Sequence, residues 1–201
     1  MRCKNETAVL AAAVAALFAL PAVGAEGPRY TYADIGYVDL DVDDVSGFDI
    51  DGDGFSIAGS VALADNWHIF AGYDDAELDV DGGEGLSGSV DLQDLSIGVG
   101  FNTGVTDTID FVARLWFVDR DLEFFDDNGY GLGAGVRAMV MPKLELNGAI
   151  EYTDIGDFED DTALVLGGVY NFTDVFAATA GVTFSDDITQ YGIGVRAYFG
   201  K

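Results

Sequence analysis

Residues 191–199, YGIGVRAYF, alternate large apolar side chains with glycine or polar ones. Successive side chains of a β-strand point to opposite faces, so this period of two predicts a strand with one apolar face. The apolar face holds Tyr191, Ile193, Val195, Ala197 and Phe199. The opposite face holds Gly192, Gly194, Arg196 and Tyr198.

The same alternation recurs through the chain after residue 29. The alternating stretches are 29–42, 54–63, 67–78, 94–102, 110–118, 130–140, 145–152, 162–172, 176–184 and 191–199. Short connections, at 64–66, 102–107, 141–143 and 171–174, alternate with longer or more acidic ones, at 41–53, 76–92, 119–129, 154–161 and 185–190. The pattern predicts an all-β protein, a closed antiparallel up-and-down transmembrane β-barrel. Ten strands are the preferred interpretation, and eight remain the alternative if one hairpin has another structure.

A soluble β-sandwich also alternates, but there the polar face is the wet one. Here the face opposite the large apolar side chains is rich in glycine and other small residues, which suit the crowded interior of a narrow barrel. Aromatic residues gather near the ends of the apolar faces and resemble the girdles at the two bilayer interfaces. They include Trp67, Tyr152, Phe172, Phe176 and Phe199.

The composition combines strong acidity with high hydrophobicity. The 201 residues carry a formal charge of −27, yet 49% are hydrophobic and the mean hydropathy is +0.21. Such a surface repels nucleic acid, because binding a phosphate backbone requires a basic footprint. The acidic and apolar residues must therefore be segregated in space.

The N-terminal residues have the layout of a secretory signal. Arg2 and Lys4 precede an apolar run from Ala8 to Leu20, and small residues stand before a cut after Ala25. The run is shorter than the ~20 residues that span a bilayer as a helix. We therefore expect residues 1–25 to be a signal peptide and residues 26–201 to be the barrel. The only cysteine, Cys3, lies in the signal, so the mature chain has no thiol chemistry.

Several charges fall in the middle of strands on the inward face. These are Arg114, Arg137 and Arg196, together with Asp94, Asp110, Glu145 and Glu151. A lipid-facing Arg near the bilayer midplane costs ~2–4 kcal/mol, whereas inside the lumen it can bind carboxylates. The preferred interpretation is an ion network that fills the lumen. The alternative is a charged constriction in a narrow pore.

The acidic segments and the single histidine carry the side chains with the most potential for chemistry. Asp49, Asp51 and Asp53 have the spacing of a calcium loop, but Ser60 stands where an EF-hand needs Glu, so we expect only weak binding of divalent cations. Such cations could link the acidic extracellular loops to lipopolysaccharide. His68 lies beside the short turn at 64–66, and Ser60 is the only serine on that side of the adjacent strand ends, so neither catalysis nor a cofactor is expected.

The whole mature chain resembles small outer-membrane β-barrel proteins of the OmpA-transmembrane, OmpX and opacity-porin type. The features that carry the resemblance are the strand–turn units at 63–67 and 170–174 and the closing stretch 191–199. That stretch is similar to the C-terminal signal read by the barrel-assembly machinery. Two departures are Gly200-Lys201 after the final aromatic residue, and ten strands in place of eight.

The resemblance implies a place in the outer membrane of a Gram-negative cell envelope. Outer-membrane lipid and lipopolysaccharide would surround the barrel, and both termini would lie in the periplasm. The expected function is a non-enzymatic structural or surface-interaction role, with a filled lumen. A narrow cation-preferring, porin-like channel is the alternative.

Overall fold

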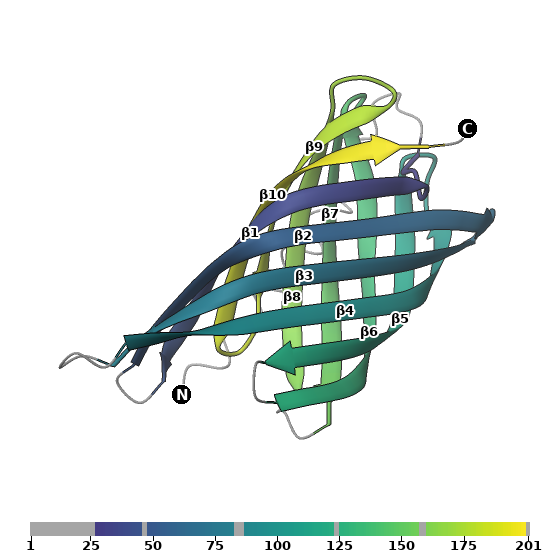
Figure 1. The fold of residues 1–201 in the computed structure, drawn as a ribbon. Coiled ribbons are helices and arrows are strands. Elements are labelled where there is room, and N and C mark those ends of the chain that lie inside the picture. The colour runs from purple at the N-terminus through teal and green to yellow at the C-terminus, as the bar shows by residue number, and fades with distance from the viewer. Residues whose placement is uncertain (1–26, 46–47, 83–86, 123–124, 157–159, 200–201) are drawn as a thin grey trace, which may run out of the picture.

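The computed structural model describes residues 27–45, 48–82, 87–122, 125–156 and 160–199, and these form ten β-strands (Figure 1). The predicted signal peptide and the last two residues lie outside the described residues. The strands are β1 (Tyr32–Val45), β2 (Phe48–Ala64), β3 (Trp67–Asp81), β4 (Ser87–Gly104), β5 (Ile109–Leu122), β6 (Phe125–Met141), β7 (Leu144–Ile155), β8 (Asp161–Asn171), β9 (Phe176–Phe184) and β10 (Ile188–Tyr198). None of the described residues forms a helix long and apolar enough to cross a membrane.

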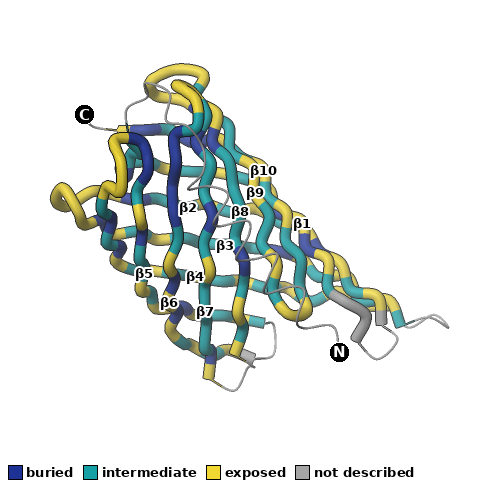
Figure 2. Tube along the Cα trace, turned by 180° about the vertical axis from the view of Figure 1, so that it is seen from behind, coloured by how far each residue is buried: buried dark blue, intermediate teal, exposed yellow. Residues whose placement is uncertain are grey.

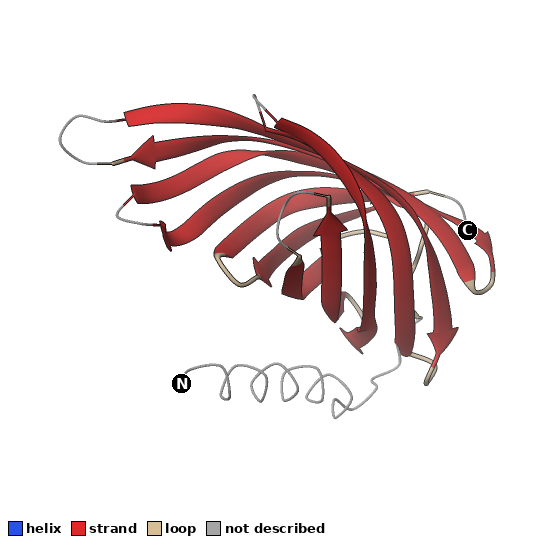
Figure 3. Ribbon diagram, turned by 90° about the horizontal axis from the view of Figure 1, so that it is seen from below, coloured by secondary structure: helices blue, strands red, loops and turns tan. Residues whose placement is uncertain are grey.

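The sheet closes on itself. Each strand pairs antiparallel with the next along the chain, and β10 returns to pair with β1 through partners such as Ala33 and Ala197. Figure 3 shows the sheet curving round. Closure satisfies the backbone groups that an open sheet would leave at its edges. The prediction of a closed, ten-stranded, antiparallel barrel is confirmed.

The alternation of faces is also confirmed. Large apolar side chains on the outer face stay exposed, among them Ile193 at 65%, Leu63 at 63% and Ile97 at 61%. Exposed aromatic residues lie near both limits of this apolar belt, for example Phe172 at one and Tyr130 at the other. A surface of this kind is stable against hydrocarbon and not against water.

The two ends of the barrel differ, and we name them by that difference. The described chain begins and ends at one end, where the Phe199 amide donates to the Thr31 carbonyl, and we call it the terminal end. The opposite end, where β1 ends at Val45 and β4 begins at Ser87, is the acidic end. Buried residues gather at the terminal end (Figure 2).

The prediction of long acidic loops is wrong for most of its residues. β2 already begins at Phe48, β3 continues to Asp81 and β4 begins at Ser87, so the acidic segments are strands that lengthen the hairpins. β2–β4 project at the lower left of Figure 1. Asp and Gly are poor strand formers, but pairing with a neighbouring strand overrides that weak preference.

The two faces exchange polarity beyond the apolar belt. In β1 the outward Tyr37 is followed on the same face by Asp39, whereas the inward Val38 and Leu40 are buried and form a cluster with Ala76 of β3. This reversal is the pattern of a sheet in water with a small core of its own. It places the acidic end outside the lipid.

Inward glycines make room for large side chains on the neighbouring strand. The Trp116 indole lies over Gly131, where an added Cβ would collide with the ring, and the His68 ring lies over Gly100 in the same way. Pairing one large residue with one glycine lets a narrow lumen hold aromatic side chains. These glycines are required for close approach, not for a turn.

Candidate functional site

The lumen holds the charged residues that the sequence singled out, and its most buried pair lies at the terminal end. Arg137 of β6 donates from Nε to Glu145 Oε1 at 2.7 Å and from Nη2 to Oε2 at 3.0 Å. The two side chains are 7% and 1% exposed. The pair spans adjacent strands diagonally, because Arg137 lies opposite Asn147 in the ladder and Glu145 lies opposite Met139.

The segment before β1 folds into the lumen at this end. The Tyr30 hydroxyl donates to Asp110 Oδ2 at 2.8 Å, and the ring stacks on His68 with centroids 4.8 Å apart. The Arg137 guanidinium lies 4.5 Å from the Tyr30 ring centroid on another side.

Backbone contacts hold the same segment in place. The Tyr30 carbonyl accepts from Ser60 Oγ at 2.8 Å, and the Arg29 carbonyl accepts from Arg137 Nη2 at 3.1 Å. The Arg29 guanidinium lies 3.5 Å from the centroid of the Tyr198 ring. Together with Arg137–Glu145 these residues form one packed layer, which we call the Tyr30 layer. The alternation predicts a strand from residue 29 and gives Tyr30 no special role, although its inward parity places an aromatic ring on the lumen side.

A second ion pair lies further into the barrel. Arg196 of β10 donates from Nε and Nη2 to the two carboxylate oxygens of Asp34, at 2.8 and 2.7 Å. Its guanidinium also lies 3.7 Å from the Tyr32 ring centroid. Asp34 was not among the predicted partners, yet it lies directly opposite Arg196 between β1 and β10. Only the closure of the barrel brings the two strands together.

The third pair lies toward the acidic end. Asp94 was predicted as a partner, and it binds Arg120, whose Nε donates to Asp94 Oδ1 at 2.8 Å. Arg120 was missed because residues 119–129 were assigned to a loop, whereas β5 continues through Arg120 on the inward face. Arg120 lies six residues after Arg114, so period-two alternation places both side chains on the same face. This spacing could have revealed Arg120 as a lumen residue.

Arg114 and Glu151 face the same part of the lumen without a direct ion pair. Both belong to one row across β5, β6 and β7, with Gly133 between them. The Arg114 guanidinium lies 5.2 Å from the Phe70 ring centroid. Of the seven predicted charges, only Arg137 and Glu145 pair with each other. Arg196 and Asp94 pair with residues outside the prediction, and Asp110 accepts from Tyr30.

Cavities separate these layers. One of about 280 Å³ lies between Arg137–Glu145 and Arg196–Asp34, and one of about 340 Å³ adjoins it through Arg196 and Asn147. A cavity of about 150 Å³ toward the acidic end shares Thr183 and Gln190 with the second. At the terminal end lies a cavity of about 380 Å³, which shares Glu145 with the cavity of about 280 Å³.

The carboxylates proposed as a weak cation loop lie elsewhere. Asp49, Asp51 and Asp53 are on β2, with exposed side chains on the outward face, so the description of a loop is wrong. Within the described part of the chain no group of three or more His, Cys, Asp or Glu side chains is placed to hold a metal ion. Asp53 belongs to a straight row across four strands, with Asp39, Glu77 and Asp91.

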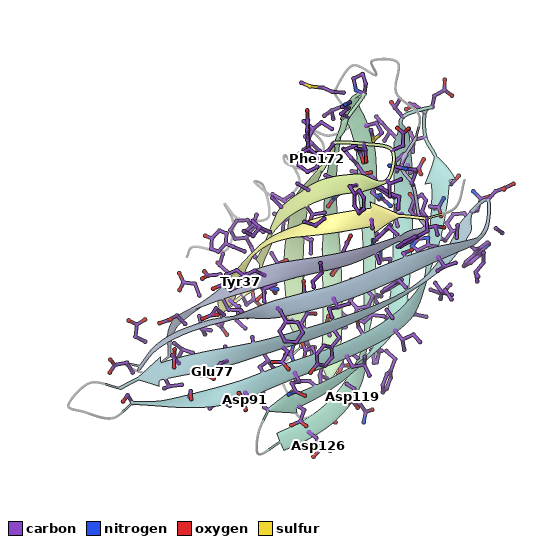
Figure 4. The ribbon with its side chains drawn as sticks, turned by 45° about the horizontal axis from the view of Figure 1, so that its top comes forward. Tyr37, Glu77, Asp91, Asp119, Asp126 and Phe172 are labelled. Carbon is purple, nitrogen blue, oxygen red and sulfur yellow. The ribbon has the colours of Figure 1, made fainter. Side chains whose placement is uncertain are left out.

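The acidic face and the aromatic belt occupy different heights on the barrel. Figure 4 shows Glu77, Asp91, Asp119 and Asp126 toward the acidic end, and Phe172 at the opposite end. The aromatic Tyr37 lies between them.

The chain was also compared with known proteins. Solved structures of similar fold include the KdgM porin in complex with disordered oligogalacturonate, at 13% identity, TM-score 0.50 and coverage of 84% of this chain and 99% of that one. They also include the NanC porin, at 11% identity, TM-score 0.52 and coverage of 85% and 100%. An outer-membrane channel from Pseudomonas putida F1 matches at 10% identity, TM-score 0.53 and coverage of 89% and 99%. At these identities the likeness shows the fold alone. No curated protein matches the chain.

The family model of the outer membrane protein beta-barrel domain matches residues 9–184, most of the chain. It agrees with the closed ten-stranded sheet, the exposed apolar belt and the polar lumen. The chain belongs to the outer-membrane β-barrel protein family, and its strands cross the bacterial outer membrane.

Proposed function

We propose that this protein is a non-enzymatic outer-membrane barrel whose lumen is closed to solutes and whose acidic end interacts with the cell's surroundings. The terminal end would face the periplasm and the acidic end the exterior. This orientation is supported by the two-residue turns 65–66 and 142–143 at the terminal end, because the short turns of such barrels are the periplasmic ones. The projecting β1–β4 hairpins have an acidic outer face that needs water. Outer-membrane lipid and lipopolysaccharide would surround the belt, with divalent cations held weakly by the outward carboxylates. The alternating strand ending at Phe199 would be the part read by the barrel-assembly machinery.

The observation that carries the closed lumen is the Tyr30 layer. Tyr30 is 8% exposed and Glu145 is 1% exposed, and this burial supports a lumen filled by protein at this height. An unpaired charge in such a place is costly, and the ion pair between Arg137 and Glu145 offsets that cost. Passage of a solute would require this layer to open.

A narrow, cation-preferring channel is the second candidate. The adjoining cavities favour it, because they follow one another from the terminal end to the acidic end. On the inward face of the described strands carboxylates outnumber arginines, with Asp74 and Asp161 beside Arg120–Asp94. A lumen with that balance would attract cations.

Conductance of the folded barrel in planar bilayers separates the two candidates. The closed barrel predicts no discrete steps, and Tyr30→Ala should introduce them because it removes the ring between Arg137 and His68. Tyr30→Phe is the matched control, since it keeps the ring. Cation-selective steps in the unaltered protein that shift in Arg137→Gln would favour the channel and refute the closed lumen. Lack of steps in Tyr30→Ala, in protein whose heat-modified mobility shows it folded, would mean that another layer closes the lumen.

Labelling of single cysteines tests the orientation. The chain has one cysteine, Cys3, within the predicted signal peptide, so new cysteines would report without background. In intact cells a membrane-impermeant maleimide should label Glu77→Cys and not Lys143→Cys. The reverse result would place the acidic end in the periplasm.

A further inference from the structure

We propose that the edge of β4 at the acidic end, residues 87–91, binds an extended basic peptide as an added β-strand. The partner is defined by its chemistry: unpaired backbone groups on one side, with basic and apolar side chains in alternation. The inference rests on the proposed surface role, and it names the kind of partner that such a surface accepts.

The edge exists because β4 is longer than its neighbour on one side. β3 pairs with β4 from Ser87 to Phe101, whereas β5 pairs with it only from Leu92 to Gly104. Among the described residues, 87–91 therefore have a strand on one side only. In an antiparallel sheet alternate residues direct their N–H and C=O groups to each side, so this edge presents donors and acceptors to the missing strand.

The edge lacks the features that usually prevent pairing. Natural edge strands carry lysine, proline, a bulge or an inward charge. Residues 87–91 read SGSVD, with no proline or basic residue, and the ladder with β3 shows no register shift there. The one charge, Asp91, is on the outward face. The segment is thus open to β-augmentation, in which main-chain hydrogen bonds provide much of the affinity.

The outward face beside the edge selects a basic partner. Asp91 ends the row of carboxylates that runs across β1–β4 through Asp39, Asp53 and Glu77. The next outward row consists of Asp41, Asp51 and Asp79, and it reaches the edge at Ser89. Like charges directly opposite one another repel across a sheet. A fifth strand that placed Lys or Arg beside Asp91 would relieve this repulsion.

The inward face adds the second half of the pattern. Val90 is flanked across the ladder by Leu78, and Gly88 by Val80. Alternate residues of an added strand would meet this apolar face, while the residues between them would meet the carboxylates. The partner that fits has basic and apolar side chains in turn.

A second copy of this chain is a poorer partner for the edge. Pairing two β4 edges would bring two acidic outward faces side by side, each with Asp91 at its edge and with the rows of β1–β3 behind it. The charge that selects a basic peptide therefore opposes self-association. Binding should weaken as salt is added, because exposed charges are screened.

The test uses the full barrel in lipid nanodiscs and a short, end-blocked peptide of alternating lysine and valine. Binding is measured by isothermal titration, with a glutamate–valine peptide as the charge control. Two further peptides are N-methylated, one at every lysine and one at every valine, so that each loses a different set of N–H groups. One of the two sets faces the edge, and that form should lose about tenfold in affinity. The other should bind like the parent.

Variants locate the site. Glu77→Gln combined with Asp91→Asn removes two charges beside the edge and should weaken binding about fivefold. The matched pair Asp126→Asn with Asp154→Asn removes two charges from β6 and β7 and should change affinity little.

Equal binding of both methylated peptides, or equal weakening by both variant pairs, would mean diffuse attraction and overturn the proposal. The proposal would also be overturned by a dimer of the barrel that becomes stronger in the Glu77→Gln/Asp91→Asn variant and is not displaced by the peptide. That result would mean that the edge binds a second copy of this chain. These readouts do not depend on conductance, so a channel would refute the closed lumen and leave this result intact.

Discussion

Substitution of Glu145 by Gln tests how much the Tyr30 layer depends on its ion pair. Breaking a buried pair by removing one partner typically costs about 3–5 kcal/mol, because the remaining charge has no counter-ion. Gln keeps one acceptor for Arg137, and Arg137 keeps its bond to the Arg29 carbonyl at 3.1 Å. We therefore expect a loss of about 3 kcal/mol in the free energy of unfolding, at the lower end of that range.

The other ion pairs provide a scale for this value. Arg120 and Asp94 are 30% and 20% exposed, so water screens the charge left by Asp94→Asn. The expected loss is at most about 1 kcal/mol, the value typical of exposed pairs. Asp34→Asn should fall between the two, since Arg196 and Asp34 are 11% and 20% exposed.

Urea unfolding in detergent or lipid vesicles measures all three variants. Tryptophan fluorescence reports the transition, because Trp116 lies in the lumen and Trp67 on the outer face. Arg137→Met combined with Glu145→Gln should recover most of the loss, since no unpaired charge then remains. A loss below about 1 kcal/mol for Glu145→Gln, or equal losses for Glu145→Gln and Asp94→Asn, would refute burial of the pair as the cause.

Three further predictions follow from the two faces of the sheet. Gly131→Ala should lower the free energy of unfolding in urea by about 1–3 kcal/mol, because the added Cβ collides with the Trp116 indole. Gly88→Ala is the neutral control, since its Cβ would have nothing within 4 Å. Ile97→Arg should lower the free energy of unfolding by about 2–4 kcal/mol, since it puts a charge in the lipid-facing belt. Gln93→Arg, on the same face of β4 but nearer the acidic end, should be tolerated. Equal losses for the two variants would contradict the assigned height of the belt. Asp53→Asn should raise the urea midpoint at low salt by relieving repulsion within its carboxylate row, and the gain should vanish at high salt. A gain independent of salt would exclude that cause.

Much of the fold follows from local pattern. Period-two alternation assigns each residue of a strand to one of two faces, and Arg114, Arg137 and Arg196 all face the lumen as that parity predicts. The number of strands and the apolar belt follow in the same way. The acidic segments were misread as loops because their residue types favour turns, although DIDGD at 49–53 and ELDV at 77–80 also alternate.

The partners of the lumen charges depended on tertiary structure. Parity says that a side chain faces inward, but the register between strands decides which inward side chains meet. Arg196 and Asp34 are 162 residues apart and meet only because β10 closes against β1. Tyr30 reaches Asp110 and His68 only after the strands have formed the lumen that it fills. Local alternation along the chain is thus enough to predict the strands and their faces, since these depend on neighbouring residues. The pairing of charges, the closed layer and the free edge of β4 were decided by tertiary structure, because each depends on how far one strand extends beside another.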